Sequence, residues 1–467
     1  MKNLTQFITP QLKKVHSGKV RESLQIDQKT RIIVATDRIS CFDKVLKTSI
    51  PHKGAVLNGL SCAWMDKTRH IVDNHLIKMV DPNISLVKEA HPIRIEMIVR
   101  KFMTGSIWRE YSKGKRVFSG VKLPDSLKKN DPFPELIVTP TTKGVKDEEI
   151  SPEDIVNQGI VGKDLYEEMS KLSRELFSFG YELCASKNLI LVDSKYEFGM
   201  CGDDLILIDE IHTPDSSRFW CAEHYDKDPS EEFSMDKEYM RQWILRQEDP
   251  KDVCSLPENI VEEASKRYLR VYEALLGEKF SLDSKYMSER MYKNLRAASL
   301  IKDAYVAIVM GSKKDFSHAE KIKELLESYD VMVDMRVLSA HKNGERISSF
   351  SEEYNRSIDP GAVIAVAGMS NGLGGALAAN LVLPVINCPP SKDNSDIILN
   401  LHSSLMMPSK TPASTCIGIE NAVQMALRSL NLQRLRSLFL EDIQEMKREL
   451  KENDFDLREK TRKCVQV

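Results

Sequence analysis

The segment VAGMSNGLGGALAAN, residues 366–380, lies within residues 361–391, where no side chain is charged. Charged residues make up 29% of the whole chain, so a charge-free segment of this length is unusual here. A membrane-spanning helix needs about 20 uninterrupted apolar residues, but Asn371, Asn380 and Pro384 interrupt this one. We therefore expect several short elements in this segment and no membrane span.

A second alternative for the segment is a dinucleotide-binding loop. The fingerprint G-x-G-x-x-G, if it began at Gly372, would need a glycine where the chain has Leu377. The acidic residue expected about 20 residues later would be Asp393, which lies beyond two prolines. A third alternative, a strand, loop and helix that receive a small anionic molecule, is therefore favoured.

The chain around this segment alternates between apolar runs and amphipathic stretches. This alternation predicts a parallel, doubly wound sheet with helices between its strands. The expected strands are 305–311, 331–340, 361–368 and 383–388, and the expected helices are 315–330, 343–357 and 376–382. The chain from about Gly418 onward is predicted to be helical and ends in a charged, solvated helix or tail.

The N-terminal part has a different pattern. Short strand-like runs such as RIIVATD, RIEMIVRKF, LIVTP and LILIDE are separated by long loops, which indicates an α+β domain. A lysine-rich helical stretch follows. We expect an α+β domain at 1–260, a helical linker at 261–302, an α/β domain at 303–435 and a charged helical tail at 436–467.

Length and composition limit the function classes. A single core stops growing near roughly 250 to 300 residues, so 467 residues predict two domains. The 67 Lys and Arg residues nearly balance the 69 Asp and Glu residues, so no net charge favours nucleic acid or an anionic membrane. Nine cysteines without a CxxC motif and an N-terminus without a secretory pattern indicate a cytoplasmic protein.

Three polar loops follow predicted strands of the second domain: GSKKD (311–315), SAHK (339–342) and AGMSNGLGG (367–375). Ligands of parallel open sheets collect at the carboxyl ends of the strands. We therefore expect these loops to form a pocket for a phosphorylated small molecule. Among their side chains, His341 has an unperturbed pKa near neutrality and is a candidate acid or base. The alternative is a histidine that caps a helix or lies in the core.

These three loops, together with PVINCPP and SSLMMPS, resemble the aminoimidazole ribonucleotide (AIR) carboxylase family over residues 303 to about 430. The SAHK and SNGLGG forms resemble the class that takes CO2 directly. The resemblance implies a flavodoxin-like three-layer domain that needs no metal or ATP. Lys314 and Met369 depart from the family pattern. The resemblance implies catalytic roles for His341, Lys342 and Asp315, and an AIR and CO2 site formed by Gly311, Ser312, Asp315, Ser339, Ala340, His341, Gly368, Ser370, Asn371, Gly372 and Leu373.

The first domain carries weaker signals when each is considered alone. The turn in HSGKVRE (16–22) can contact phosphates through backbone N–H groups. Glu197 and Asp209 end neighbouring apolar runs separated by a short turn, which predicts an antiparallel hairpin. Two carboxylates on adjacent strands can share a Mg²⁺ that also holds nucleotide phosphates. The alternative is a pair of surface hairpin charges.

Together, GKVRE, VATDRISCFD, VRKFMTGSIWREY, TPTTKG, DSKYEFG and LIDEIHTPDSSRFW resemble the phosphoribosylaminoimidazole-succinocarboxamide (SAICAR) synthetase family over residues 10 to about 260. The resemblance implies an α+β fold related to ATP-grasp enzymes. It assigns ATP to Gly18, Lys19, Val20 and Arg21, Mg²⁺ to Glu197 and Asp209, and the carboxylated ribonucleotide (CAIR) to Arg100, Ser106, Lys143, Lys195, Asp215, Ser217 and Arg218. Asp37 is a first candidate for deprotonating the amine of aspartate.

The two resemblances fit together, because the product of the second domain would be the substrate of the first. We expect a bifunctional enzyme of purine biosynthesis, a carboxy-lyase and a ligase. It would carboxylate AIR with CO2 to CAIR and then join CAIR to L-aspartate with ATP, giving SAICAR. The resemblance also implies a homo-oligomer, an octamer. The rival hypotheses are an inactive nucleotide-binding scaffold and an NAD-linked oxidoreductase.

Overall fold

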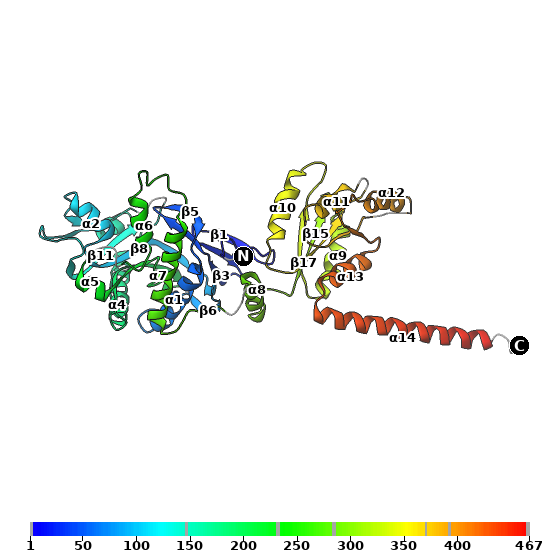
Figure 1. The fold of residues 1–467 in the computed structure, drawn as a ribbon. Coiled ribbons are helices and arrows are strands. Elements are labelled where there is room, and N and C mark those ends of the chain that lie inside the picture. The colour runs from blue at the N-terminus through cyan, green and yellow to red at the C-terminus, as the bar shows by residue number, and fades with distance from the viewer. Residues whose placement is uncertain are drawn as a thin grey trace. The chain divides into compact units, whose positions relative to one another are not determined.

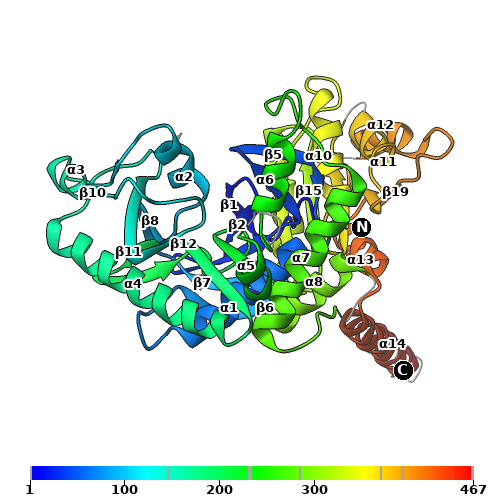
Figure 2. The same ribbon diagram turned by 60° about the vertical axis from the view of Figure 1, so that its left-hand side comes forward.

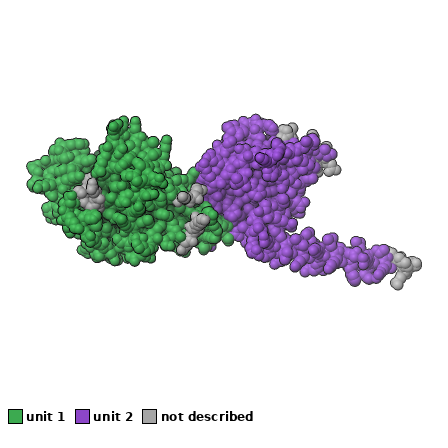
Figure 3. All heavy atoms as spheres, in the orientation of Figure 1, with its two compact units in different colours: residues 1–7, 12–298 green, residues 8–11, 299–467 purple. Residues whose placement is uncertain are grey.

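The computed structural model describes residues 3–144, 148–229, 234–282, 286–368, 371–390 and 394–463. The chain divides into two compact units, residues 1–7 with 12–298 and residues 8–11 with 299–467 (Figure 3). No helix among the described residues is long and apolar enough to cross a membrane.

The helical stretch expected to be a separate linker belongs to the first unit. It forms α7 (Glu258–Leu276) and α8 (Met287–Ala297). Tyr268, Val271 and Leu275 of α7 are buried in the main core of this unit. Arg290 of α8 pairs with Asp81 at 2.9 Å and is also buried. The two helices are not a separate linker because they bury their inner faces against the rest of the first unit.

An antiparallel sheet of five strands forms one part of the first unit, in the order β1-β2-β3-β7-β6. One helix, α1 (Lys53–Lys67), packs against β3, β6 and β7. The turn between the first two strands contains Gly18 and Lys19. The strands are β1 Lys13–Ser17, β2 Arg21–Gln25, β3 Thr30–Ala35, β6 Leu76–Asp81 and β7 Ile84–Lys88.

A second antiparallel sheet has the order β11-β8-β12-β13, and β14 also pairs with β12. The long helix α4 (Lys163–Ala185) packs against this sheet (Figure 2). The strands are β8 His91–Phe102, β11 Pro132–Thr142, β12 Leu189–Cys201, β13 Asp204–Ile208 and β14 Ser217–Cys221. The predicted hairpin is present as β12 and β13, with Glu197 opposite Ile208.

The remaining elements of the first unit are short. They are β4 Arg38–Cys41, β5 Lys44–Ser49, β9 Val117–Phe118, β10 Val121–Lys122, α2 Gly105–Ser112, α3 Pro152–Asn157, α5 Ala222–Lys227 and α6 Glu238–Leu245.

The second unit contains a parallel sheet of five strands in the order β16-β15-β17-β18-β19. This is the strand order of a flavodoxin-like sheet, and the predicted parallel, doubly wound sheet is confirmed. Two strands of this sheet, β15 and β17, are labelled in Figure 1. The strands are β15 Tyr305–Met310, β16 Met332–Val337, β17 Gly361–Val366, β18 Val385–Asn387 and β19 Ser414–Thr415.

Helices cover both faces of this sheet. Alternate residues of each strand point to opposite faces, so each face forms its own core with the helices that cover it. Val306 and Ile308 pack in one core with α9 and α13, whereas Ala307 and Val309 pack in another with α10 and α11. The helices are α9 Phe316–Ser328, α10 Glu345–Asn355, α11 Gly372–Ala378, α12 Asn394–Leu405, α13 Ile419–Leu430 and α14 Gln433–Lys463. The last of these is the predicted charged C-terminal helix.

Candidate active sites

Three strand-end loops of the second unit come together, as the sequence predicts. An ideal Cβ placed on Gly311, after β15, would lie 3.2 Å from Cβ of Ala367, which follows β17. A Cβ on Gly372 would lie 3.3 Å from Cε1 of His341, in the loop after β16. The His341 side chain is therefore beside the N-terminus of α11. His341 and Lys342 are both exposed, so His341 is not a core histidine.

The first of these loops is held by a hydroxyl cap. Ser312 Oγ accepts a hydrogen bond from the backbone N–H of Lys314 at 3.2 Å, where a short 3₁₀ turn (Lys313–Asp315) begins. Burial raises the pKa of Asp315, while the nearby His318 lowers it less. In the second loop, the N–H of Ser339 donates to Asn343 Oδ1 at 2.7 Å. These bonds order the loops around the candidate site.

A buried polar cluster supports the third loop. Asn371 is 2% exposed, and its Nδ2 donates to Ser404 Oγ at 2.8 Å. An ideal Cβ on Gly374 would lie 1.6 Å from Asn387 Oδ1, so position 374 has no room for a side chain. Ser403 also contacts this loop, since its Oγ accepts from the N–H of Asn371. Of the other residues expected to bind AIR, Gly368 follows β17, Leu373 lies in the first turn of α11, and Ala340 precedes His341. Ser370, also expected to bind AIR, lies outside the described residues.

Sequence reasoning did not assign roles to Asn387, Ser403 and Ser404. The motifs PVINCPP and SSLMMPS contain all three. The signal was therefore present in the sequence, but a pairing between residues 371 and 404 cannot be derived from spacing.

In the first unit, one lysine lies among three carboxylates. Lys195 Nζ is 2.8 Å from Glu96 Oε1, 2.5 Å from Glu197 Oε1 and 3.9 Å from Asp209 Oδ2. Lys143 donates to the other oxygen of Glu197. Burial acts to raise the pKa of Glu197, but Lys195 and Lys143 outweigh it, so the pKa lies below its usual value. Glu197 is therefore an ionised, buried carboxylate.

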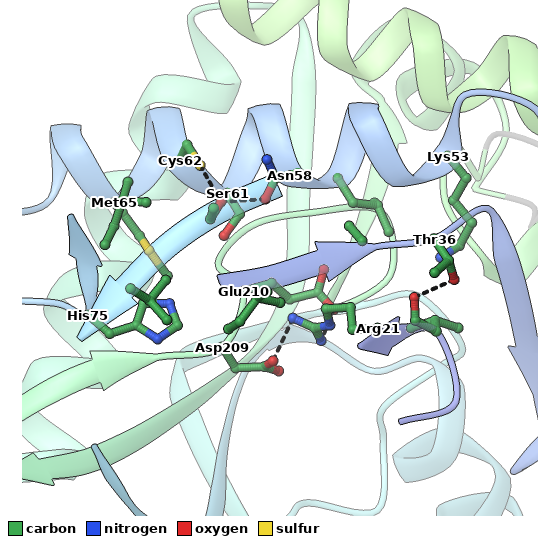
Figure 4. Close-up of a pocket in the computed structure, with 17 residues that line it drawn as sticks. Arg21, Thr36, Lys53, Asn58, Ser61, Cys62, Met65, His75, Asp209 and Glu210 are labelled. Carbon is green, nitrogen blue, oxygen red and sulfur yellow. Dashed lines mark hydrogen bonds and ion pairs between the residues drawn. The ribbon is translucent and has the colours of Figure 1, made fainter. Parts of the chain in front are cut away.

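Asp209 links this cluster to Arg21, which follows the turn that contains Gly18 and Lys19. Arg21 NH1 is 2.5 Å from Asp209 Oδ1, and Arg21 NH2 is 3.0 Å from Glu210 Oε1 (Figure 4). Asp209 has a φ of 68°, in the left-handed region. Lys19 lies on the preceding turn with Gly18, and its Nζ forms an exposed ion pair with Asp43 at 2.6 Å. Arg21 thus contacts a carboxylate expected to hold the metal, and Val20 lines a cavity with it.

The two expected metal ligands fit Mg²⁺ by their donor chemistry. Carboxylate oxygens suit this ion, which commonly binds one or two protein carboxylates together with substrate phosphates. Among the described residues, no group of three or more His, Cys, Asp or Glu side chains is arranged to hold a metal ion. Glu197 and Asp209 share Lys195 as a neighbour, as expected of two carboxylates at one end of a hairpin.

A group of arginines lies around one buried carboxylate. Arg100 NH1 is 3.3 Å from Asp193 Oδ2, and Arg218 donates to the same oxygen. Ser106 Oγ accepts from Arg100 at 3.4 Å. Arg218 Nε is buried and has no hydrogen-bond partner among the described residues, so it can donate to an anionic ligand. Asp193 was not singled out from the sequence, although it begins the DSKYEFG motif.

The turn before β14 holds a second buried network. Asp215 Oδ2 is 2.8 Å from Lys53 Nζ, and Asp215 Oδ1 accepts from Tyr268 OH at 2.8 Å. Burial acts to raise the pKa of Asp215, yet Lys53 and Lys237 lower it strongly. Ser217 Oγ donates to Ser194 Oγ at 2.8 Å. Asp215 is therefore already paired with two lysines of the protein, Lys53 and Lys237.

The candidate proton acceptor Asp37 is placed elsewhere. Its side chain is fully buried, and its two oxygens accept from the N–H groups of Leu4 at 2.7 Å and Gly54 at 2.9 Å. It does not line the cavity that contains Arg100, Lys195 and Arg218. Asp37 anchors the N-terminus of α1, so it is not positioned to take a proton from a substrate.

Most of these groups line one open cavity of about 480 Å³ in the first unit. Its lining includes residues expected to bind either ATP phosphates or the ribonucleotide. They are Lys19, Val20, Arg100, Ser106, Lys195, Asp215, Ser217 and Arg218. Arg21 and Asp209 line an adjoining, much smaller cavity of about 30 Å³ beneath α1 (Figure 4). Glu210 lines both cavities. The larger cavity is suited to a large anionic ligand because its cations are held in fixed positions.

Comparisons with known proteins identify a family for each part of the chain. Residues 14–255 match the SAICAR synthetase family and residues 305–453 match the AIR carboxylase family. The chain is 41% identical to the phosphoribosylaminoimidazole-succinocarboxamide synthase of Flavobacterium psychrophilum over 303 residues, 62% of this chain and 96% of that protein. The synthase of Bacteroides thetaiotaomicron is also 41% identical, over 304 residues, 62% of this chain and 96% of that protein. The SAICAR synthase of Saccharomyces cerevisiae in complex with SAICAR is similar in structure, with a TM-score of 0.54 and 34% identity, covering 60% of this chain and 100% of that one.

Proposed function

The chain belongs to the SAICAR synthetase family and also carries an AIR carboxylase domain, and from this premise we propose how its residues divide the two reactions. The protein is a bifunctional enzyme of purine biosynthesis, with ligase and carboxylase activities. The observation that carries the proposal is the convergence of Arg100, Ser106, Lys195 and Arg218 on one cavity.

In the first unit, we propose that the arginines bind CAIR and that the turn at Gly18 to Arg21 binds ATP phosphates. Arg218 supports this assignment because its buried Nε has no partner among the described residues. ATP would phosphorylate the carboxylate of CAIR, and the amine of aspartate would displace phosphate. Lys195 and the arginines would offset the negative charge that builds up on the transferred phosphoryl group.

Glu197 and Asp209 are the residues that would hold Mg²⁺. When bound, the ion would neutralise charge on the nucleotide phosphates. Ion pairs with Lys143, Lys195 and Arg21 hold both carboxylates in place.

In the second unit, we propose that His341, Lys342 and Asp315 surround the reacting imidazole. The nucleophilic ring carbon of AIR would form a bond to CO2, and His341 would take the proton from that carbon. The position of His341 beside the N-terminus of α11 supports this role. The glycine-rich loop offers backbone N–H groups to a phosphate. For the carboxylase reaction, we infer that neither a metal nor a nucleotide is required.

We also propose that the protein works as a homo-oligomer, an octamer, in the cytoplasm. Leu440, Leu450 and Leu457 of α14 are 61 to 69% exposed, which supports further association. The eight described cysteines are all free, as a reducing compartment permits. Sedimentation velocity would test the assembly.

The function itself is tested by supplying purified protein with AIR, bicarbonate, ATP, Mg²⁺ and L-aspartate. We expect SAICAR to form, and mass spectrometry would detect it. Absence of any product, with binding of NAD in a titration, would favour the oxidoreductase alternative. Binding of ATP and CAIR without turnover would favour an inactive scaffold.

A further inference from the structure

We propose that Lys237 is the group that accepts a proton from the ammonium group of the incoming amino-acid substrate in the ligase cavity. This inference rests on the proposed function of the first unit. It replaces Asp37, whose carboxylate is occupied by two backbone N–H groups.

The backbone fixes Lys237 at the edge of the cavity. It is the N-cap residue of α6, and its N–H donates to the carbonyl of Pro214 at 3.1 Å. This bond holds it against the turn that leads into β14, where Ser217 and Arg218 lie, and all three residues line the same cavity. Its side chain is 13% exposed, so it is nearly enclosed yet faces the ligand space.

The nearest acid is already engaged by another lysine. Lys237 Nζ is 4.0 Å from Asp215 Oδ2, whereas Lys53 Nζ is 2.8 Å from the same oxygen. Tyr268 donates to the other oxygen of Asp215. At 4.0 Å, the contact of Lys237 Nζ with Asp215 is a long ion pair and is beyond hydrogen-bond distance. Its nitrogen is thus available to a ligand.

The pKa of Lys237 lies below its usual value, and burial is the largest cause. Asp215 and Cys41 act in the opposite direction, whereas Arg241 and Lys53 lower this pKa further. The N-terminus of α6 adds an unfavourable interaction with a cation, since helix N-termini carry partial positive charge. A neutral lysine can act as a base because it can receive a proton.

The carboxylates that line the cavity are less suitable. Asp236 accepts from the N–H groups of Phe219 at 2.8 Å and Glu238 at 2.7 Å, so it fixes the backbone. Asp193 is held by Arg100 and Arg218. Asp43 is exposed and paired with Lys19. Burial raises the pKa of Asp236 to about 7, but both of its oxygens are occupied by backbone N–H groups. Asp193 and Asp43 are each occupied by cations of the protein.

The proposed step balances as follows. One proton leaves the ammonium nitrogen of the amino acid and binds neutral Nζ of Lys237. The free amine then forms a bond to the carbonyl carbon of the acyl phosphate, and the bond from that carbon to the phosphate oxygen breaks. Phosphate leaves with the electron pair and takes the second proton from nitrogen, while the amide retains the third.

Two variants test the role, Lys237→Met and Lys237→Arg, assayed with CAIR, ATP and Mg²⁺. Hydroxylamine, which is neutral near pH 7, replaces aspartate in a parallel assay and traps the acyl phosphate as a hydroxamate. We expect both variants to form hydroxamate within about three-fold of the native rate. We expect coupling to aspartate at pH 7 to fall by about 10²-fold to 10⁴-fold, the usual contribution of a positioned base. The loss for Lys237→Met should shrink as pH rises, because free aspartate amine becomes more abundant.

The matched control is Lys187→Met, which removes an exposed lysine of the same unit and should behave as the native protein in both assays. Equal losses of hydroxamate and of SAICAR would overturn the inference, because Lys237 would then act in binding or phosphorylation. Unchanged coupling would overturn it as well. If the native protein made neither product, the proposed ligase function would fail instead, so the two failures are distinct.

Discussion

Glu96 and Glu197 lie directly opposite each other on the antiparallel strands β8 and β12, and Lys195 Nζ lies between their carboxylates. Like charges directly opposite on neighbouring strands are destabilising. Both glutamates are at least nine-tenths buried, so water does little to screen them. The lysine therefore stabilises the sheet by pairing with both carboxylates, and it helps to lower the pKa of Glu197 where phosphates are proposed to bind.

Replacing Lys195 by Met should make this relationship measurable. Removal of one partner from a buried pair costs about 3 to 5 kcal/mol, and we expect about 2 to 3 kcal/mol because Lys195 keeps 28% of its side-chain exposure. All four tryptophans lie in the first unit, so tryptophan fluorescence in urea reports its unfolding. The double variant Lys195→Met with Glu96→Gln should recover part of the loss. No recovery would mean that the two glutamates do not repel each other.

Gly105 tests the position of Arg218. A Cβ at Gly105 would lie 2.3 Å from Arg218 NH2, and the residue has a φ of 67°. We expect Gly105→Ala to displace the guanidinium and to raise KM for CAIR by about ten-fold or more, since removing an interaction worth 1.4 kcal/mol changes affinity ten-fold. Gly159→Ala is the matched control, because its φ is 65° and no atom lies within 4 Å of its Cβ. Both variants incur similar backbone strain, so an equal rise in KM would contradict the assignment.

Gly374 tests the support of the carboxylase loop. Its Cβ would collide with Asn387 Oδ1, so Gly374→Ala should shift the start of α11. A misplacement of about 1 Å can reduce a rate by about 10²-fold, and we expect a loss of this order in carboxylation with ligation unaffected. Adding Asn387→Ala removes the colliding atom and should restore part of the rate. If Gly374→Ala had native carboxylation, the loop would not position the substrate.

His212 makes the first unit sensitive to acid. Burial lowers its pKa to about 3, while its Nε2 lies 2.6 Å from Tyr196 OH. Between pH 6.5 and 3 the unfolded chain binds a proton at this site and the folded chain does not. The free energy of unfolding should therefore fall by about 1.4 kcal/mol for each pH unit lost in this window. In His212→Asn this part of the slope should be absent, whereas His70→Asn, at an exposed position, should keep it. An unchanged slope in His212→Asn would assign the acid sensitivity to other groups.

The parts predicted from sequence are those with a local signal. The parallel sheet follows from alternating apolar runs, and the hairpin of β12 and β13 follows from two runs and a short turn. Helix α1 was not expected, because nearly all its residues are buried and no polar face gives it a helical period. Arg290 and Asp81 pair across 209 positions of the chain, and no spacing rule reaches that far. The proposed role of Lys237 likewise depends on which acid Lys53 occupies, and only the fold reveals that contact.

The division of labour between the units is tested most directly by measuring the two half-reactions separately in His341→Ala and Arg218→Met. We expect His341→Ala to convert supplied CAIR to SAICAR at the native rate while forming no CAIR from AIR and bicarbonate. We expect Arg218→Met to show the reverse. If His341→Ala stopped the ligation of supplied CAIR, the assignment of one reaction to each unit would be contradicted.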